Sequence, residues 1–140
     1  VQDAVARGAT VTTGGAIPDR AGSFYPATVI TGVQAGTRLL AEEIFGPVLA
    51  IVPFDTEDEA VELANATEYG LISYVYTTDL NRGMRMIDRL ETGMMGLNAG
   101  VISNAAAPFG GVKQSGIGRE GSFEGIDEYL TTKYTFVPKA

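Results

Sequence analysis

An acidic and aromatic cluster stands directly before the most apolar run of the sequence. Glu43 and Phe45 are separated by one residue, and Gly46-Pro47 then fixes the backbone as the chain enters the run from Val48 to Phe54. A carboxylate can accept hydrogen bonds from two vicinal ribose hydroxyls, and a nearby phenyl ring can lie against a flat ring. A glutamate exposed to solvent and a phenylalanine packed in the core would explain the same pair of residues. The cluster is therefore a candidate ligand contact that needs support from other segments.

A second candidate group lies between Asn98 and Gly121, a segment rich in Gly, Ala and Ser. A long connection of this kind in a compact domain is more often functional than idle. Ser103 offers a short hydroxyl donor there, and Phe109 follows it between a proline and two glycines. An ordinary turn serine is the alternative interpretation of Ser103.

Two further patterns favour structural explanations. Gly116 to Gly121 spells GxGxxG, which is typical of phosphate-binding turns in dinucleotide folds. No apolar strand ends just before it, however, and too little chain follows to complete a strand-helix-strand unit. We therefore expect these glycines to permit unusual backbone angles. Asn65-Ala66-Thr67 spells a glycosylation site, but it falls at the end of a predicted helix, so a structural role is expected.

The composition excludes several kinds of chemistry. The 140 residues contain no cysteine and no histidine, so the chain offers no thiolate nucleophile, no disulfide and no zinc cluster. We therefore assign it no catalytic residue and no metal. A formal net charge of -7, with scattered lysines and arginines, argues against nucleic acid and anionic membranes as partners. No apolar run is long enough to cross a bilayer.

Strands and helices alternate through the middle of the chain, a pattern typical of α/β folds with a parallel sheet and right-handed crossover helices. Thr56 and Glu59 form a capping box before one helix, and Thr78 or Asp79 can cap the next. Such sheets bind ligands at the carboxyl ends of their strands, so a site is expected in the loop after Leu97. The predicted strands are Val48–Phe54, Leu71–Thr77 and Met94–Asn98, and the apolar stripes of the helices are Ala60, Val61, Leu63 and Ala64, then Leu80, Met84, Ile87 and Leu90.

The two ends of the chain carry less diagnostic patterns. The sequence predicts an amphipathic helix over Val1–Ala9, β-prone stretches over Thr10–Thr13 and Tyr25–Val33, and a helical turn followed by a strand over Tyr129–Val137. That last strand would leave an unpaired edge, so we expect another chain or domain to pair with it. Because the sequence starts at Val1 rather than Met, a longer parent is expected. The lack of a leader and of cysteine indicates the cytoplasm, although removal of an upstream targeting segment would leave the same pattern.

Five separate motifs together resemble a known family. In order and spacing, they are similar to the C-terminal part of the NAD(P)-dependent aldehyde dehydrogenases, and most similar to the succinate-semialdehyde dehydrogenases within that family. The resemblance extends over essentially the whole chain. The motifs are EEIFGPVLAIVPF, YGLISYVYTTD, LNAGVISN, APFGGVKQSGIGREG and GIDEYLTTKY.

The resemblance implies roles for the four candidate residues. Glu43 would hold the hydroxyls of the nicotinamide ribose, and Phe45 would lie beside the nicotinamide. Ser103 would donate a hydrogen bond to the distal carboxylate of the substrate, and Phe109 would help to shape the pocket. A short hydroxyl suits an anionic tail, whereas a bulky aromatic at that position would suit apolar aldehydes.

The resemblance also implies an organisation and partners. Residues 1–127 would belong to the catalytic domain, and residues 128–140 would form a terminal strand that joins copies of the protein into a homo-oligomer. The cofactor would be NAD or NADP, with the choice made at the ribose 2′ position by a domain that this chain lacks. The partner would be a small-molecule aldehyde.

The family's catalytic cysteine, its water-activating glutamate and its Rossmann-like domain resemble nothing in this chain. A thiohemiacetal cannot form without a thiol, so the chain alone is expected to be inactive. Two alternatives stay open at this point. The parent enzyme can act on another aldehyde, such as a betaine-type or longer semialdehyde, or the chain can serve as a non-catalytic interaction module.

Overall fold

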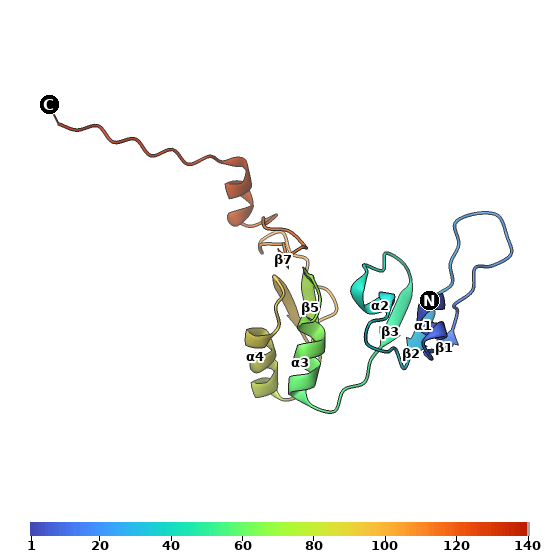
Figure 1. Cartoon of the computed structure of the whole chain (residues 1–140). Coiled ribbons are helices and arrows are strands. Elements are labelled where there is room, and N and C mark those ends of the chain that lie inside the picture. Colours follow the sequence, from blue (N-terminus) through green and yellow to red (C-terminus); the bar gives the residue numbers. More distant parts are fainter. Residues whose placement is uncertain (140) are drawn as a thin grey trace. The chain divides into compact units, whose positions relative to one another are not determined.

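Short strands with β-branched residues build the first part of the computed structural model, which describes residues 1–139 (Figure 1). The chain divides into two compact units, the first from Val1 to Glu62 and the second from Leu63 onward. Each unit has its own sheets and helices, as the mixed α/β pattern of the sequence predicts. Within the described residues, no helix is both long enough and apolar enough to span a membrane.

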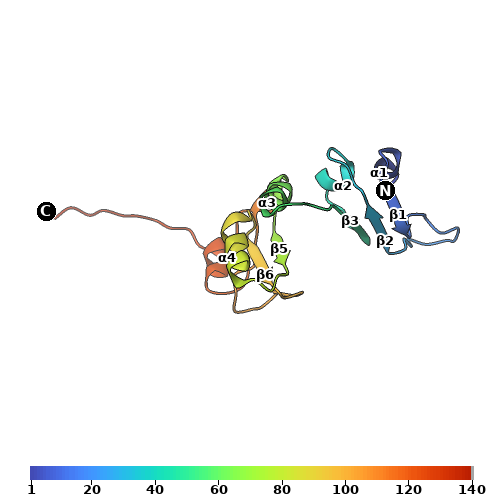
Figure 2. The same ribbon diagram turned by 90° about the horizontal axis from the view of Figure 1, so that it is seen from below.

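The first unit is a three-stranded sheet with two short helices beside it (Figure 2). The central strand β2 pairs with β1 in an antiparallel manner and with β3 in a parallel manner. Ala4, Ala9, Ile30 and Val33 form its small buried core. The elements are α1 (Gln2–Ala6), β1 (Thr10–Thr13), β2 (Thr28–Thr31), α2 (Arg38–Ala41) and β3 (Val48–Ile51).

The second unit contains two small sheets. Strand β5 (Ile72–Val75) runs parallel to β6 (Met94–Leu97), and helix α4 (Leu80–Arg89) connects them, so the predicted strand-helix-strand unit is confirmed. The other elements are β4 (Tyr69–Gly70), which pairs with β7 (Val112–Lys113), and the 3-10 helix η1 (Glu124–Tyr129). Helix α3 (Glu57–Asn65) spans the boundary between the two units.

The expectation of one parallel sheet made from all three central strands is wrong. Strand β3 takes β2 as its parallel partner, whereas β5 and β6 pair only with each other among the described residues. Strand β2, from an earlier part of the chain, supplies the backbone hydrogen-bond partners of β3. The apolar composition of β3 predicts burial but does not identify its partner strand.

Both predicted helix starts are confirmed. The Thr56 hydroxyl accepts a hydrogen bond from the Glu59 N–H at 3.1 Å, and the Glu59 carboxylate accepts one from the Asp55 N–H at 2.8 Å. For α4 the cap is Asp79, whose carboxylate accepts hydrogen bonds from Asn81 and Arg82 N–H groups at 2.9 and 3.2 Å. Side-chain acceptors therefore satisfy backbone donors that the first helical turn leaves free.

The predicted inward faces of the helices are largely wrong. In α4 the buried residues are Gly83 and Met86, because a glycine lets the helix approach Leu97 of β6 closely; a Cβ at Gly83 would lie 2.9 Å from a Leu97 methyl. In α3 only Val61 is buried. The stripe residues Leu80, Met84, Ile87 and Leu63 are instead 69%, 52%, 44% and 43% exposed.

Asn65 has the structural role that the sequence predicts. Its amide donates to the Arg89 carbonyl at 2.8 Å, and its side-chain oxygen accepts from the Glu91 N–H at 2.9 Å. The Lys113 ammonium donates to the Asn65 and Thr67 carbonyls at 3.0 and 3.3 Å. The side chain of Asn65 thus ties the ends of α3 and α4 together.

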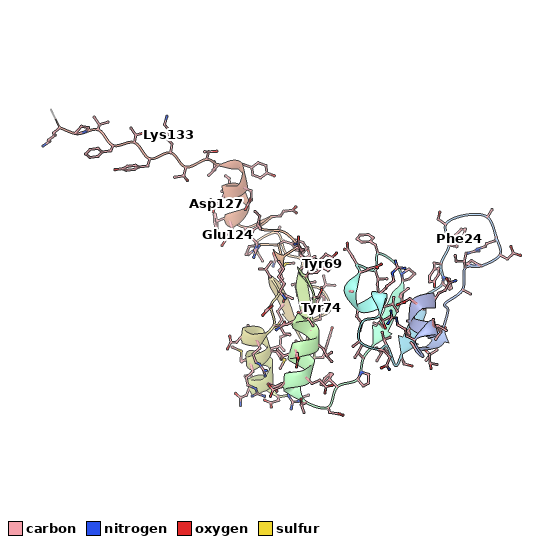
Figure 3. All side chains as sticks on the ribbon, in the orientation of Figure 1. Phe24, Tyr69, Tyr74, Glu124, Asp127 and Lys133 are labelled. Carbon is pink, nitrogen blue, oxygen red and sulfur yellow. The ribbon has the colours of Figure 1, made fainter. Side chains whose placement is uncertain are left out.

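The chain beyond η1 is extended and exposed. The predicted helical turn is confirmed as η1, but the predicted strand over Tyr129–Val137 is not formed, because no described segment pairs with it. Figure 3 shows Lys133 on this extended segment, beyond Glu124 and Asp127 of η1. Ala140, the last residue of the predicted arm, lies outside the described residues.

Candidate functional site

A chain of charged contacts leads to the turn that carries Glu43. The Asp3 carboxylate of α1 accepts the Arg38 backbone N–H at 3.0 Å, so it caps the start of α2, where Thr37 makes no side-chain cap. The Arg38 guanidinium then donates two hydrogen bonds to the Glu42 carboxylate, at 2.7 and 2.8 Å. Glu42 ends α2 and immediately precedes Glu43.

The same contacts shift the ionisation of both carboxyl groups. Hydrogen bonding from the Arg38 side chain lowers the pKa of Glu42. The Arg38 backbone N–H, followed by the Arg7 side chain, lowers the pKa of Asp3. Because the folded-state pKa values are lowered, these contacts add stability above the ordinary carboxyl pKa and lose it as the pH falls through the lowered values.

Replacing Arg38 by Gln is expected to return the pKa of Glu42 toward its ordinary value, because it removes both guanidinium hydrogen bonds. The carboxyl ¹³C chemical shift of Glu42, followed by NMR during an acid titration, measures the change. Arg20→Gln is the matched control, since the Arg20 guanidinium carbon lies 3.8 Å from the centre of the Phe24 ring, and Figure 3 shows Phe24 in another loop. An unchanged Glu42 titration in Arg38→Gln would show that the ion pair does not persist in solution.

Glu43 and Phe45 lie together on a hollow of the first unit. The hollow has a volume of about 750 Å³, and Tyr25, Arg38 and Leu39 also line it. Glu43 is exposed, and Phe45 is 96% exposed, so the ring has almost no packing contact within the chain. A Phe45 ring packed in the core, the alternative interpretation of this cluster, is therefore not observed. The turn offers a carboxylate and a free aromatic face to a ligand or to other polypeptide.

Ser103 and Phe109 lie in one loop of the second unit, which runs from β6 to β7. Ser103 is exposed between Ile102 and Asn104, two residues that line a hollow of about 260 Å³ together with Phe109. Phe109 is 37% exposed and also lines a hollow of about 710 Å³. The loop thus presents a hydroxyl and a half-covered ring within a few residues.

The segment that follows β7 returns to the end of this loop and holds it by hydrogen bonds. Phe109 and Glu120 exchange two backbone hydrogen bonds of 2.7 Å, and the Arg119 guanidinium donates to the Gly111 and Gly118 carbonyls at 2.7 and 2.8 Å. Gly116 and Gly121 have φ values of 117° and 68°. Gly116 and Gly121 therefore take unusual backbone angles, as the sequence predicts. The nearest preceding strand is the two-residue β7, which Gln114 and Ser115 separate from Gly116.

Two residues that organise this loop were not singled out from the sequence. Arg119 ties its end to the neighbouring glycines, and Asn98 ties its start to Thr77. The position of Arg119 between glycines is a usable signal, because a lone guanidinium there can meet exposed backbone carbonyls. Asn98 directly after a strand is a second signal, because asparagine tolerates left-handed backbone angles.

The structure brings the candidate residues together in two pairs. Glu43 and Phe45 share a turn of the first unit, and Ser103 and Phe109 share a loop of the second. Within residues 1–139, no group of acidic side chains is arranged to hold a metal ion.

Comparison with known proteins gives a consistent family. Residues 1–135 match the model of the aldehyde dehydrogenase family. The chain is 56% identical to a succinate-semialdehyde dehydrogenase of Paenarthrobacter nicotinovorans over 134 residues, 96% of this chain and 30% of that protein. It is 51% identical to a 3-sulfolactaldehyde dehydrogenase of Pseudomonas putida, over 96% of this chain and 28% of that protein.

A solved structure supports the same relationship. The crystal structure of succinate-semialdehyde dehydrogenase from Burkholderia pseudomallei superposes with a TM-score of 0.88 at 50% identity, covering 91% of this chain and 27% of that one. The chain therefore spans less than a third of the length of the relatives that it matches.

Proposed function

Because the chain belongs to the aldehyde dehydrogenase family, we propose that it is the C-terminal part of an NAD(P)-dependent enzyme that oxidises succinate semialdehyde to succinate. The complete polypeptide that carries this chain is called the full-length enzyme below. The observation that carries the proposal is the nearly complete exposure of Phe45 beside the exposed Glu43, on the rim of a hollow. The chain's own packing leaves both side chains available.

Glu43 and Phe45 are the proposed cofactor contacts. The Glu43 carboxylate accepts hydrogen bonds from the two hydroxyls of the nicotinamide ribose, and the Phe45 ring lies beside the nicotinamide. When bound, NAD(P)⁺ accepts the hydride that the aldehyde carbon loses on oxidation. The two residues fix the orientation of the dinucleotide, which matters because hydride transfer needs the reacting atoms in close alignment.

Ser103 and Phe109 are the proposed substrate contacts. The Ser103 hydroxyl donates a hydrogen bond to the distal carboxylate of the aldehyde, and Phe109 packs against its short carbon chain. Similarity to a protein named 3-sulfolactaldehyde dehydrogenase agrees with this assignment, because that aldehyde also carries an anionic group at its far end. An aldehyde with an anionic tail is therefore the favoured substrate class, with other aldehydes as the alternative.

The remaining assignments concern organisation. Residues 1–127 form part of the catalytic domain, and residues 128–140 form a terminal segment whose part beyond η1 pairs as a strand with another copy in a homo-oligomer. The extended, exposed chain from 131 to 139 supports the second assignment, because it has no strand partner among the described residues. We retain the cytoplasm as the proposed compartment.

Replacing Ser103 by Ala in the full-length enzyme is expected to lower kcat/KM for succinate semialdehyde about ten- to a hundredfold, the size of one hydrogen bond to a charged group. The kcat/KM for butanal, which has the same number of carbons and no carboxylate, is expected to stay within about twofold, because no hydrogen bond is lost with it. Steady-state kinetics on both aldehydes measures the difference.

Ser23→Ala is the matched control, since Ser23 is an exposed serine in a loop of the first unit. It is expected to change neither value. A Ser103→Ala enzyme that loses activity equally on both aldehydes, or on neither, would contradict the proposed contact.

A further inference from the structure

Asn98 makes an unusual pair of contacts at the end of β6. Its side-chain oxygen accepts a hydrogen bond from the Thr77 N–H at 2.9 Å, and its side-chain amide donates one to the Thr77 carbonyl at 2.9 Å. Its own N–H donates to the Val75 carbonyl at 2.8 Å. The side chain thus takes the place of a backbone partner and extends the pairing of β5 and β6 by one step.

The backbone of Asn98 turns sharply at this step. Its φ is 53°, in the left-handed region that non-glycine residues rarely adopt. Asparagine tolerates this region better than most residues, and the two bonds to Thr77 hold it there. The chain therefore leaves the sheet at Asn98 in a direction that both the backbone angle and the side chain determine.

The exit from β6 determines where the substrate loop lies. Ser103 is five residues after Asn98, which corresponds to up to roughly 16 Å of extended chain. Over that length, a small rotation of the backbone at Asn98 can displace Ser103. A hydrogen bond to a bound carboxylate tolerates misplacement of only about 0.5 Å. The far end of the loop is held separately, by the backbone pair of Phe109 and Glu120.

We propose that Asn98 is a positioning residue for substrate specificity. Its two side-chain hydrogen bonds to the Thr77 backbone fix the start of the loop and thereby place the Ser103 hydroxyl. This inference rests on the proposed function, because it assumes that Ser103 meets the anionic tail of the aldehyde. Asn98 acts through Ser103 and does not itself contact substrate or cofactor. Its expected effect is therefore on the preference for aldehydes with an anionic tail.

Two variants of the full-length enzyme separate the side-chain contacts from the backbone angle. Asn98→Gly keeps the left-handed backbone accessible and removes both bonds to Thr77. Asn98→Asp keeps the acceptor for the Thr77 N–H but sets a carboxylate against the Thr77 carbonyl. Asn81→Asp is the matched control, since Asn81 is an exposed residue in the first turn of α4.

The expected result is a change in specificity without a general loss. Both Asn98 variants raise the KM for succinate semialdehyde about three- to tenfold, the size of a weakened hydrogen bond. They leave the KM for the dinucleotide and kcat/KM for butanal within about twofold, because the groups that bind them are not displaced. The control changes none of these values. The dinucleotide KM also verifies that each variant is folded.

The outcomes distinguish this inference from the proposed function. If the unaltered enzyme prefers succinate semialdehyde and Ser103→Ala removes that preference, but both Asn98 variants keep it, the inference is overturned while the function stands. Equal losses on both aldehydes would also overturn it, since they indicate a general structural role. If Ser103→Ala has no effect, the proposed substrate contact fails first.

Discussion

The isolated chain is expected to produce no NADH or NADPH from any aldehyde, even when its α/β structure is verified by circular dichroism. The reason is chemical: the sequence contains no cysteine, so no thiolate is present to add to the aldehyde carbonyl. Without that covalent step the hydride has no route to the dinucleotide. Absorbance at 340 nm, recorded with succinate semialdehyde and either dinucleotide, measures the rate.

The full-length enzyme is the control for this prediction. It is expected to be active under the same conditions and to lose its activity when a thiol reagent such as iodoacetamide is added. Aldehyde oxidation by the isolated chain, proportional to its concentration and insensitive to iodoacetamide, would contradict the assignment of the nucleophile to other polypeptide. If the isolated chain formed stable oligomers yet bound no cofactor by calorimetry, the alternative of a non-catalytic interaction module would be favoured instead.

Replacing Glu43 by Gln in the full-length enzyme is expected to lower kcat/KM for the dinucleotide about 10- to 100-fold. A carboxylate that accepts two ribose hydroxyls contributes one or two charge-assisted hydrogen bonds, and the neutral amide keeps only one oxygen acceptor. The loss is expected with NAD and NADP alike, because both contain the same nicotinamide ribose. Steady-state kinetics with varied dinucleotide and saturating aldehyde measures it.

Glu62→Gln is the matched control, since Glu62 is an exposed glutamate on α3. It is expected to leave kcat/KM for the dinucleotide unchanged. The assignment of Glu43 to the ribose fails if Glu43→Gln behaves like this control, or if it changes only the KM for the aldehyde.

The local structure was largely predictable because short-range chemistry determines it. The capping residues Thr56 and Asp79 satisfy helix N–H groups in their own first turns, so sequence spacing alone identifies them. The parallel pair β5 and β6 was predictable for a different reason: its strands are joined by one helix, and the strand-helix-strand connection favours pairing of the two strands that it links.

Long-range packing could not be predicted in the same way. Gly83 lets α4 approach Leu97, and this single small residue turns a face other than the most apolar one toward the sheet. The predicted inward faces of α3 and α4 are wrong because an apolar pattern indicates burial but does not identify the neighbouring element. The strand predicted over Tyr129–Val137 needs a partner from another chain or domain, so it stays a prediction; no described segment of this chain pairs with it.

The candidate site shows the same division. Glu43 and Ser103 stay predictions; their residue types suit a ribose and an anionic tail, and the family resemblance implies those contacts. The partners of Asp3 and Asn98 could not be predicted, since the Asp3 cap on α2 and the Asn98 bonds to Thr77 join positions 35 and 21 residues apart in the chain. Positioning contacts of this kind become visible only in the folded structure.

A crystal structure of the full-length enzyme with bound dinucleotide and succinate would locate both proposed contacts at once. We expect a Glu43 carboxylate oxygen about 2.6–3.2 Å from the nicotinamide ribose hydroxyls and the Ser103 Oγ at a similar distance from a succinate carboxylate. We also expect that the cysteine sulfur facing the ligands comes from outside these 140 residues. Glu43 or Ser103 packed against other protein side chains, out of reach of both ligands, would contradict the proposed contacts.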